Sequence, residues 1–150
     1  ESQKNALSDA MKFWQVIPSQ TQKYNDMTGA GISADKALYI SDIMKGIDPV
    51  AGKTNVSYWQ QAEAISNANL NESEKAAALK TYGNDAQDKN IDEMIKKGYS
   101  ADDYVTALII YTEQKTKGGS GTKERTIKQL IRELHVGRAA AEAIYNIYCQ

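Results

Sequence analysis

The chain has 150 residues, 41% of them hydrophobic and 25% charged, which is the size and composition of an ordinary globular domain. The formal net charge of -1 disfavours a uniformly basic nucleic-acid binder, and the single cysteine, Cys149, excludes an intrachain disulfide and favours a reducing compartment. The longest uncharged apolar stretch, residues 105–112, is far shorter than the roughly 20 residues of a membrane span.

An amphipathic pattern opens the chain. Apolar residues at helical spacing between Ala6 and Ile17 predict a helix that Pro18 stops. The first residue is Glu1 rather than Met and no signal peptide is recognised, so the sequence is compatible with a fragment cut from a longer protein that is not secreted through such a signal.

An internal repeat follows this segment. An offset of 67 residues lays 24–35 onto 91–102, and after a one-residue slip 69–82 overlies 135–148. The matches fall on glycines, on a Ser-Ala-Asp cap and on apolar positions rather than on common surface residues. The sequence therefore predicts two diverged copies, about 24–82 and 91–148, within a single helical domain that spans 1–150.

Each copy is predicted to begin with a short helix, a tight loop and a longer capped helix. Gly31 and Gly98 suit the left-handed position that follows a helix. Ser33 and Ser100 then serve as N-caps of the longer helices. Because the residues at N3 are Lys in one copy and Asp in the other, a full capping box is expected to be absent from both.

A helical hairpin is predicted to close each copy. Its helices are expected at about 57–67 and 71–82 in the first copy, and at about 123–134 and 138–149 in the second. The tract 118–121, Gly-Gly-Ser-Gly, precedes the second hairpin; its composition is that of an engineered linker, whereas the alignment of Gly119 with Gly52 favours a native loop. The predicted fold class is all-α with about seven helices.

The residue types that carry catalysis are sparse. His135 is the only histidine and falls on a predicted turn, and Cys149, in a last helical turn, is expected to be a small apolar filler. Paired acids such as Glu72 with Glu74, or Asp102 with Asp103, stand at helix starts, where carboxylates usually serve the helix dipole. We therefore expect no enzyme, no metal and no cofactor.

One segment has the charge of a nucleic-acid binder. Between positions 115 and 138, seven basic residues face only Glu124 and Glu133, a local balance of +5. The same region has the order of a helix-turn-helix, with a helix, a short turn that contains Gly and a second helix. Arg138 is the only side chain of the second helix able to bind guanine bidentately. The basic residues are Lys115, Lys117, Lys123, Arg125, Lys128, Arg132 and Arg138.

Two motifs carry a resemblance to a known class of proteins. Gly31-Ile-Ser-Ala-Asp35 and Gly98-Tyr-Ser-Ala-Asp102, each opening a helix that is followed by a loop and a hairpin, resemble repeats in very large phage and prophage proteins. These include tape-measure-like proteins and the polyvalent proteins of phages that infect Gram-positive bacteria. The resemblance implies a non-catalytic helical module of a long virion or injected protein, and it transfers no functional residue.

The sequence thus leads to two functional hypotheses. The first is a structural or protein-interaction module whose partner is another protein or another domain of the parent chain, located in the cytoplasm of the bacterial host or in the virion, with no membrane association. The alternative is a weak nucleic-acid-binding domain that uses the basic segment 115–138, directed at phosphates rather than at bases.

Overall fold

The computed structural model describes residues 18–47 and 56–150, and all of the regular secondary structure within them is helical. The eight described helices are α2 (Pro18–Gly29), α3 (Ala34–Ile47), α4 (Tyr58–Asn67), α5 (Glu72–Tyr82), α6 (Asp85–Lys96), α7 (Ala101–Lys117), α8 (Thr122–Leu134) and α9 (Arg138–Cys149). The all-α prediction is confirmed, and the expected count of about seven is one short of those described. The four hairpin helices begin and end within one residue of their predicted bounds.

The chain divides into two compact units, residues 1–56 and 57–150. In the described part of the first unit, α2 packs against α3, and Met27, Ile32, Ala37, Ile40 and Met44 form the buried apolar contact. The predicted helix between Ala6 and Ile17 lies outside the described residues. Pro18, its predicted stop, is the first described residue and lies in α2.

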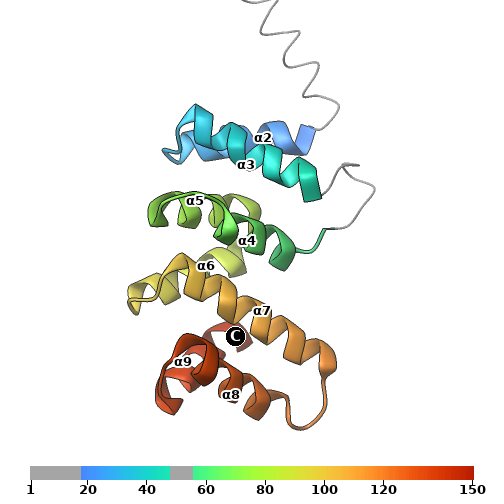
Figure 1. The fold of residues 1–150 in the computed structure, drawn as a ribbon, viewed down its shortest axis with the longest axis vertical. Coiled ribbons are helices and arrows are strands. Elements are labelled where there is room, and N and C mark those ends of the chain that lie inside the picture. The colour runs from blue at the N-terminus through green and yellow to red at the C-terminus, as the bar shows by residue number, and fades with distance from the viewer. Residues whose placement is uncertain (1–17, 48–55) are drawn as a thin grey trace, which may run out of the picture. The chain divides into compact units, whose positions relative to one another are not determined.

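The second unit consists of three consecutive helix pairs. Figure 1 shows the α6/α7 pair between the α4/α5 pair and the α8/α9 pair. The long helix α7 contacts α4, α5, α6, α8 and α9, so it is the central element of this unit. Its fully buried residues include Tyr104 and Ala107, and the helices around it bury Leu79, Ile91, Ile127 and Ile144.

The loops that precede α3 and α7 have the same local geometry. Gly31 and Gly98 have φ angles of +98° and +95°, as the left-handed prediction requires. The residue after each glycine donates its N–H to a methionine carbonyl oxygen, Ile32 to Met27 at 3.0 Å and Tyr99 to Met94 at 3.1 Å. These are the 6→1 bonds of a Schellman motif, so both helices before the glycines end in the same way.

The helix bounds follow the same offset as the sequence matches. Shifting the end of α2 by 67 residues gives the end of α6, and shifting the start of α3 by 67 residues gives the start of α7. The second lead-in helix begins at Asp85, earlier than the predicted copy boundary at 91.

The two predicted N-caps differ in strength. Ser100 accepts a 3.0 Å hydrogen bond from the Asp103 N–H, and Asp103 accepts one of 3.1 Å from the Ser100 N–H. This is a complete capping box, so the expectation that both copies lack one is wrong for α7; the shorter Asp side chain reaches as Glu would. Ser33 accepts only a 3.3 Å bond from the Lys36 N–H, and a lysine cannot return it.

Candidate functional site

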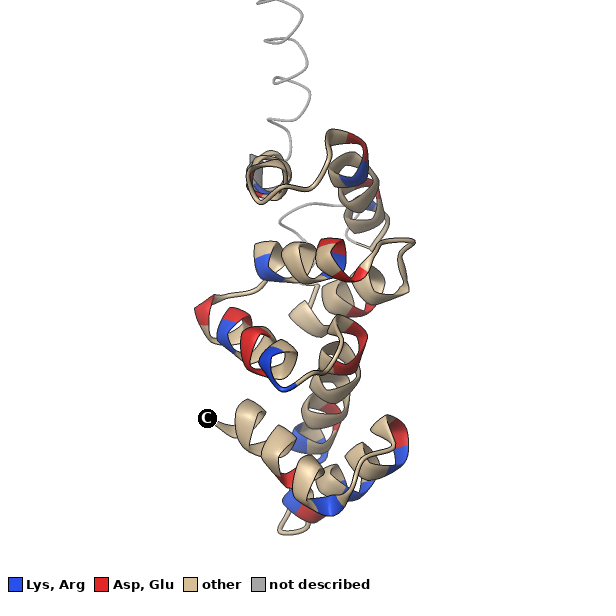
Figure 2. Ribbon diagram, turned by 90° about the vertical axis from the view of Figure 1, so that its left-hand side faces the viewer, with Lys and Arg blue, Asp and Glu red and all other residues tan. Residues whose placement is uncertain are grey.

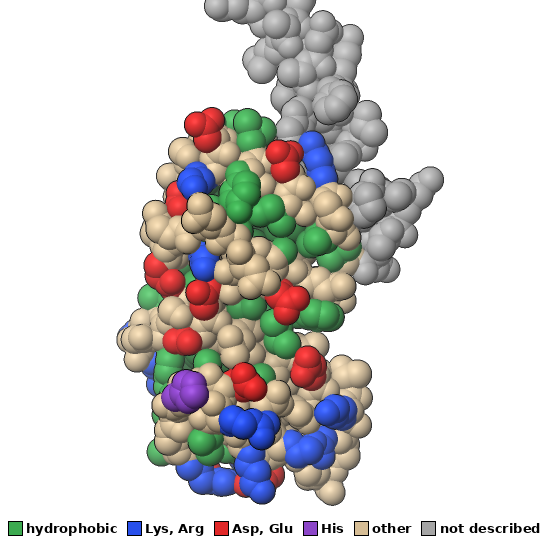
Figure 3. All heavy atoms as spheres, in the orientation of Figure 1, with side chains coloured by type: hydrophobic (Ala, Val, Ile, Leu, Met, Phe, Trp, Pro, Cys, Tyr) green, Lys and Arg blue, Asp and Glu red, His purple; other side chains and the backbone are tan. Residues whose placement is uncertain are grey.

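The seven basic residues of segment 115–138 lie on three helices at one end of the second unit. Lys115 and Lys117 are in the last turn of α7, Arg138 opens α9, and the other four are on α8. Figure 3 shows Lys and Arg side chains gathered over this end, and Figure 2 shows acidic positions interspersed among them. The predicted segment is therefore a real surface feature, but its members have different roles.

Arg125 holds the loop between α7 and α8. Its Nε donates to the Gln114 side-chain oxygen at 2.9 Å, and its Nη2 donates to the Gly118 carbonyl oxygen at 2.7 Å. The Gln114 amide in turn donates to the Gln129 side-chain oxygen at 2.9 Å. Because these bonds occupy the guanidinium inside a partly buried network, Arg125 stabilises the α7–α8 connection and is poorly placed to bind a phosphate.

Arg138 is engaged by two carboxylates. Its Nη1 and Nη2 each donate to Glu124 at 2.8 Å, and its Nε donates to Glu142 at 2.9 Å. Hydrogen bonds from Arg138 lower the pKa of Glu124, and those to Glu124 and Glu142 raise the pKa of Arg138. The one side chain that could read guanine from a recognition helix is thus already paired, which disfavours a helix-turn-helix mode of base readout.

Two lysines lie over tyrosine rings. The Lys115 ammonium is 5.7 Å from the centroid of Tyr111, and the Lys123 ammonium is 5.6 Å from that of Tyr145. Both lysines are exposed, as are Lys117, Lys128 and Arg132. The surface available to a polyanion consequently rests on Lys117, Lys123, Lys128 and Arg132, with Lys115 at its edge.

A tyrosine cluster joins the helices beneath this surface. The Tyr58 and Tyr104 hydroxyls are 3.0 Å apart, and the Tyr104 ring stacks on Tyr148 with centroids 5.8 Å apart. Burial raises the pKa of Tyr58 and Tyr148, and it raises the pKa of Tyr104 to about 12. These phenols therefore stay protonated at neutral pH and serve packing.

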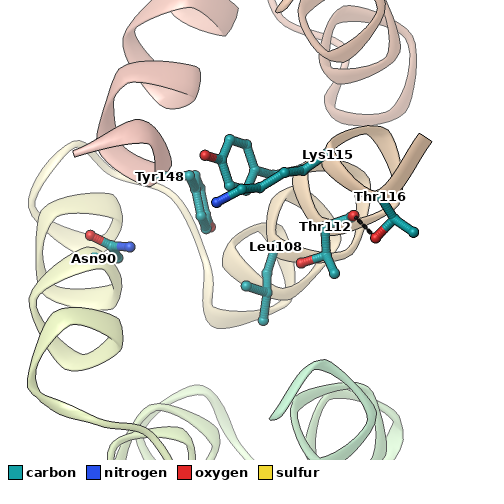
Figure 4. Close-up of a pocket in the computed structure, with 7 residues that line it drawn as sticks. Asn90, Leu108, Thr112, Lys115, Thr116 and Tyr148 are labelled. Atoms are coloured by element: carbon teal, nitrogen blue, oxygen red, sulfur yellow. Dashed lines mark hydrogen bonds between the residues drawn. The ribbon is translucent and has the colours of Figure 1, made fainter. Parts of the chain in front are cut away.

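A pocket of about 410 Å³ opens between α6, α7 and α9. Figure 4 shows the Lys115 side chain extending from α7 toward Tyr148, with Asn90 on the facing helix α6. Leu108 and Tyr111 add an apolar wall, and Thr112 and Thr116 form the rim. The seven lining residues include one cation and no carboxylate, so the pocket offers a positive charge next to apolar surface.

A second hollow, of about 420 Å³, lies on the adjacent face of the same helix. Trp59 of α4 and Ile109 of α7 supply its apolar surface, and Glu113 and Lys117 lie at its edge. Thr112 and Thr116 line both hollows, so the two are neighbours across a ridge of α7.

Two further candidates for chemistry, His135 and Cys149, lie at or near the ends of α8 and α9. His135 ends α8 in the left-handed conformation, with φ +55°, on the predicted turn. Cys149 is exposed, so the expectation of a buried filler is wrong, and its thiol hydrogen bond is the main cause that raises the pKa of Tyr145. Among the described residues, no group of three His, Cys, Asp or Glu side chains is placed to hold a metal ion.

The paired acids are used at helix starts. Glu74 and Asp103 complete capping boxes, and Glu72 accepts a hydrogen bond from the Ala101 N–H at the start of α7. Asp102 accepts bonds from Ser66 at 2.6 Å and Lys75 at 3.0 Å. Although burial acts in the opposite direction, these two bonds lower the pKa of Asp102. Glu72 and Asp102 thus tie the start of α7 to α4 and α5.

The two hollows were not predicted from the sequence. Their walls combine residues as distant as Trp59, Asn90 and Tyr148, and no local motif links these positions. Only the packing of α7 between its neighbours brings them together.

Comparison of the chain with protein-family models, with curated proteins and with solved structures gives no match. No helix in the described ranges 18–47 and 56–150 is both long and apolar enough to cross a bilayer.

Proposed function

We propose that this chain is a non-catalytic structural and protein-interaction module of a large phage or prophage protein. The observation that carries the interaction role is the layered arrangement of helix pairs in the second unit, with α7 between α4/α5 and α8/α9. Stacked helical pairs bury a continuous core along the stack and leave side surfaces for partners. The proposal of a phage origin rests on the two Gly-x-Ser-Ala-Asp motifs. In each motif the glycine is left-handed and the serine is the N-cap of the next helix.

The polar chemistry of the second unit supports the same role. Arg125, Glu72 and Asp102 each link two helices or a helix and a loop, and the buried tyrosines hold α4, α7 and α9 together. These groups rigidify the module, and a rigid surface loses less conformational freedom when a partner binds.

The proteins encoded beside the gene provide the test. Each is mixed with the purified chain, and complexes are detected by size-exclusion chromatography and mapped by cross-linking with mass spectrometry. A stoichiometric complex with one neighbour-encoded protein is the expected result. If every such protein elutes separately from the chain while duplex DNA co-elutes with it, the interaction role is wrong.

The exposed cations favour a second candidate, weak phosphate-directed binding of nucleic acid. Because Arg125 and Arg138 are engaged, about four cations remain, and a slope near -4 in log affinity against log salt is expected on duplex DNA. Replacing Lys123, Lys128 and Arg132 by Ala should reduce that slope by about 3 units.

A matched control uses Lys89, Lys96 and Lys97 on or beside α6, which are equally exposed. Their replacement by Ala removes the same charge from another surface and should leave the slope unchanged. If the two triple variants reduce the salt slope equally, DNA affinity depends on net charge alone, and nucleic-acid binding through the basic segment is refuted.

A further inference from the structure

We propose that the two hollows on either side of Thr112 and Thr116 form one docking site for an acidic segment of a partner protein. A carboxylate of this segment enters the pocket between α6, α7 and α9, and an apolar side chain enters the hollow between α4 and α7. This proposal rests on the proposed interaction function and names the partner's chemistry and the surface it meets.

The first hollow has the chemistry for a carboxylate. Lys115 extends into it toward Tyr148, and Asn90 lies across the space (Figure 4). No acidic residue lines this pocket, and the Tyr111 and Tyr148 rings, with centroids 5.9 Å apart, form one side of it. A carboxylate placed there forms an ion pair with the Lys115 ammonium, which is exposed and lies 5.7 Å from the centroid of the Tyr111 ring.

The second hollow has the chemistry for an apolar anchor. Trp59 and Ile109 provide a half-buried aromatic and aliphatic surface, of the kind that supplies binding hot spots. Glu113 and Lys117 at its edge offset each other's charge, so this hollow favours an apolar side chain rather than a second anionic group.

The spacing of the two hollows sets the expected motif. They lie on adjacent faces of one helix, on either side of the ridge of Thr112 and Thr116, so they are closer together than the helix diameter with side chains, roughly 10 Å. An extended peptide rises about 3.3 Å per residue, so the carboxylate and the apolar anchor should be separated by about two to three residues. The ridge of Thr112 and Thr116 lies under the connecting residues.

The experiment selects random peptides of about twelve residues, displayed on yeast, against the purified full chain. Enriched peptides should carry Asp or Glu two to four residues from Trp, Phe, Leu or Ile. One such peptide is then synthesised with a fluorophore, and its affinity is measured by anisotropy. Lys115→Glu should weaken binding at least tenfold, and Trp59→Ala should do the same.

Lys123→Glu is the matched control, because Lys123 also lies over a tyrosine ring and is exposed, but it lines neither hollow. It should change the affinity less than twofold. A peptide in which the acidic residue is replaced by Lys should bind Lys115→Glu more tightly than the unaltered chain. This reversal separates a direct ion pair from a loss of folding, which circular dichroism monitors independently.

Several results would overturn the proposal: no enriched peptide, enrichment of basic peptides, or acidic peptides that bind Lys115→Glu and the original chain equally well. A single-stranded oligonucleotide that binds through Lys115 while peptides do not would also overturn it. A neighbour-encoded protein that still forms its complex with Lys115→Glu would refute this site and leave the interaction function standing.

Discussion

The hydroxyl group of Tyr148 donates a 2.7 Å hydrogen bond to the main-chain carbonyl oxygen of Tyr104. The bond is buried and joins α9 to the first turn of α7. The Tyr104 hydroxyl extends the connection to Tyr58 of α4, 3.0 Å away. Tyr58, Tyr104 and Tyr148 thus link the three helix pairs of the second unit, although more than forty positions separate each tyrosine from the next.

Tyr148→Phe tests this link. The variant keeps the ring and its stacking on Tyr104 but removes the buried hydroxyl, so the unfolding free energy should fall by about 1–2 kcal/mol. Urea denaturation followed by circular dichroism measures the change. Tyr99→Phe, at a partly exposed position outside the cluster, is the control and should change stability by less than about 0.5 kcal/mol. Equal effects of the two changes would contradict the role of the Tyr148 hydroxyl.

Alkaline pH should destabilise the second unit through the buried tyrosines. Burial is the main cause that raises the pKa of Tyr82 and Tyr104 from 10.0 to about 12. Because the folded state favours the protonated phenol, its contribution is complete below the unfolded pKa of about 10 and is lost as pH rises toward 12. The urea midpoint should therefore be steady from about pH 8 to 9 and decrease steeply above about pH 10.

Tyr82→Phe serves as the control for this pH dependence. It removes one of the raised groups, so the decrease above about pH 10 should become shallower whatever the variant does to stability at neutral pH. Absorbance titration of the phenolates should show two groups of tyrosines, one that ionises near the ordinary pKa and one that ionises only at higher pH. If the urea midpoint of Tyr82→Phe decreases with pH as steeply as that of the unaltered chain, Tyr82 is not one of the groups that cause the decrease.

The two N-cap serines should differ in their contribution. Ser100→Ala removes one half of a reciprocal capping box and should cost about 1 kcal/mol. Ser33→Ala removes a single, longer hydrogen bond of 3.3 Å and should lower the unfolding free energy by only a few tenths of a kcal/mol. Hydrogen exchange of the first-turn amides of α3 and α7 measures each helix start separately. Equal loss of protection at both would contradict the distinction drawn from the Asp103 carboxylate.

Much of this fold follows from local signals. Glycines at 31 and 98, serines two residues later and apolar residues at helical spacing locate the loops and most helices, because caps and amphipathic faces are determined by neighbouring residues. The capping box at Ser100 was missed because Asp103 is shorter than the usual glutamate. The division after Val56 depends on packing between distant helices, which one sequence does not reveal.

The candidate site was much less predictable. Local charge identified the basic segment, but its members differ through distant contacts: Arg125 with Gln114, and Arg138 with Glu124. The hollows beside α7 combine Trp59 with Ile109 and Asn90 with Tyr148, pairs that no helical period relates. Sequence patterns identify which residues are charged or apolar, and only the packing of α7 decides which remain available to a partner.

The left-handed glycines give the last prediction. Gly31 and Gly98 have φ angles near +95°, and a Cβ at either position would meet no atom within 4 Å. Substitution should therefore act through backbone conformation alone: Ala and Val should each cost about 1 kcal/mol or more, with Val somewhat worse. Asn tolerates positive φ better and should cost less than either. Chemical denaturation of the six variants measures the order.

Gly46 provides the opposite control in the first unit. It lies in α3, where a Cβ would also meet open space, but its φ is in the ordinary negative range. Gly46→Ala should stabilise α3 by up to about 1 kcal/mol, because alanine loses less backbone entropy in a helix. We expect Gly31→Ala to lower the hydrogen-exchange protection of α3 and Gly46→Ala to raise it. If both substitutions raise protection, Gly31 does not need its left-handed conformation, and its equivalence to Gly98 loses its physical basis.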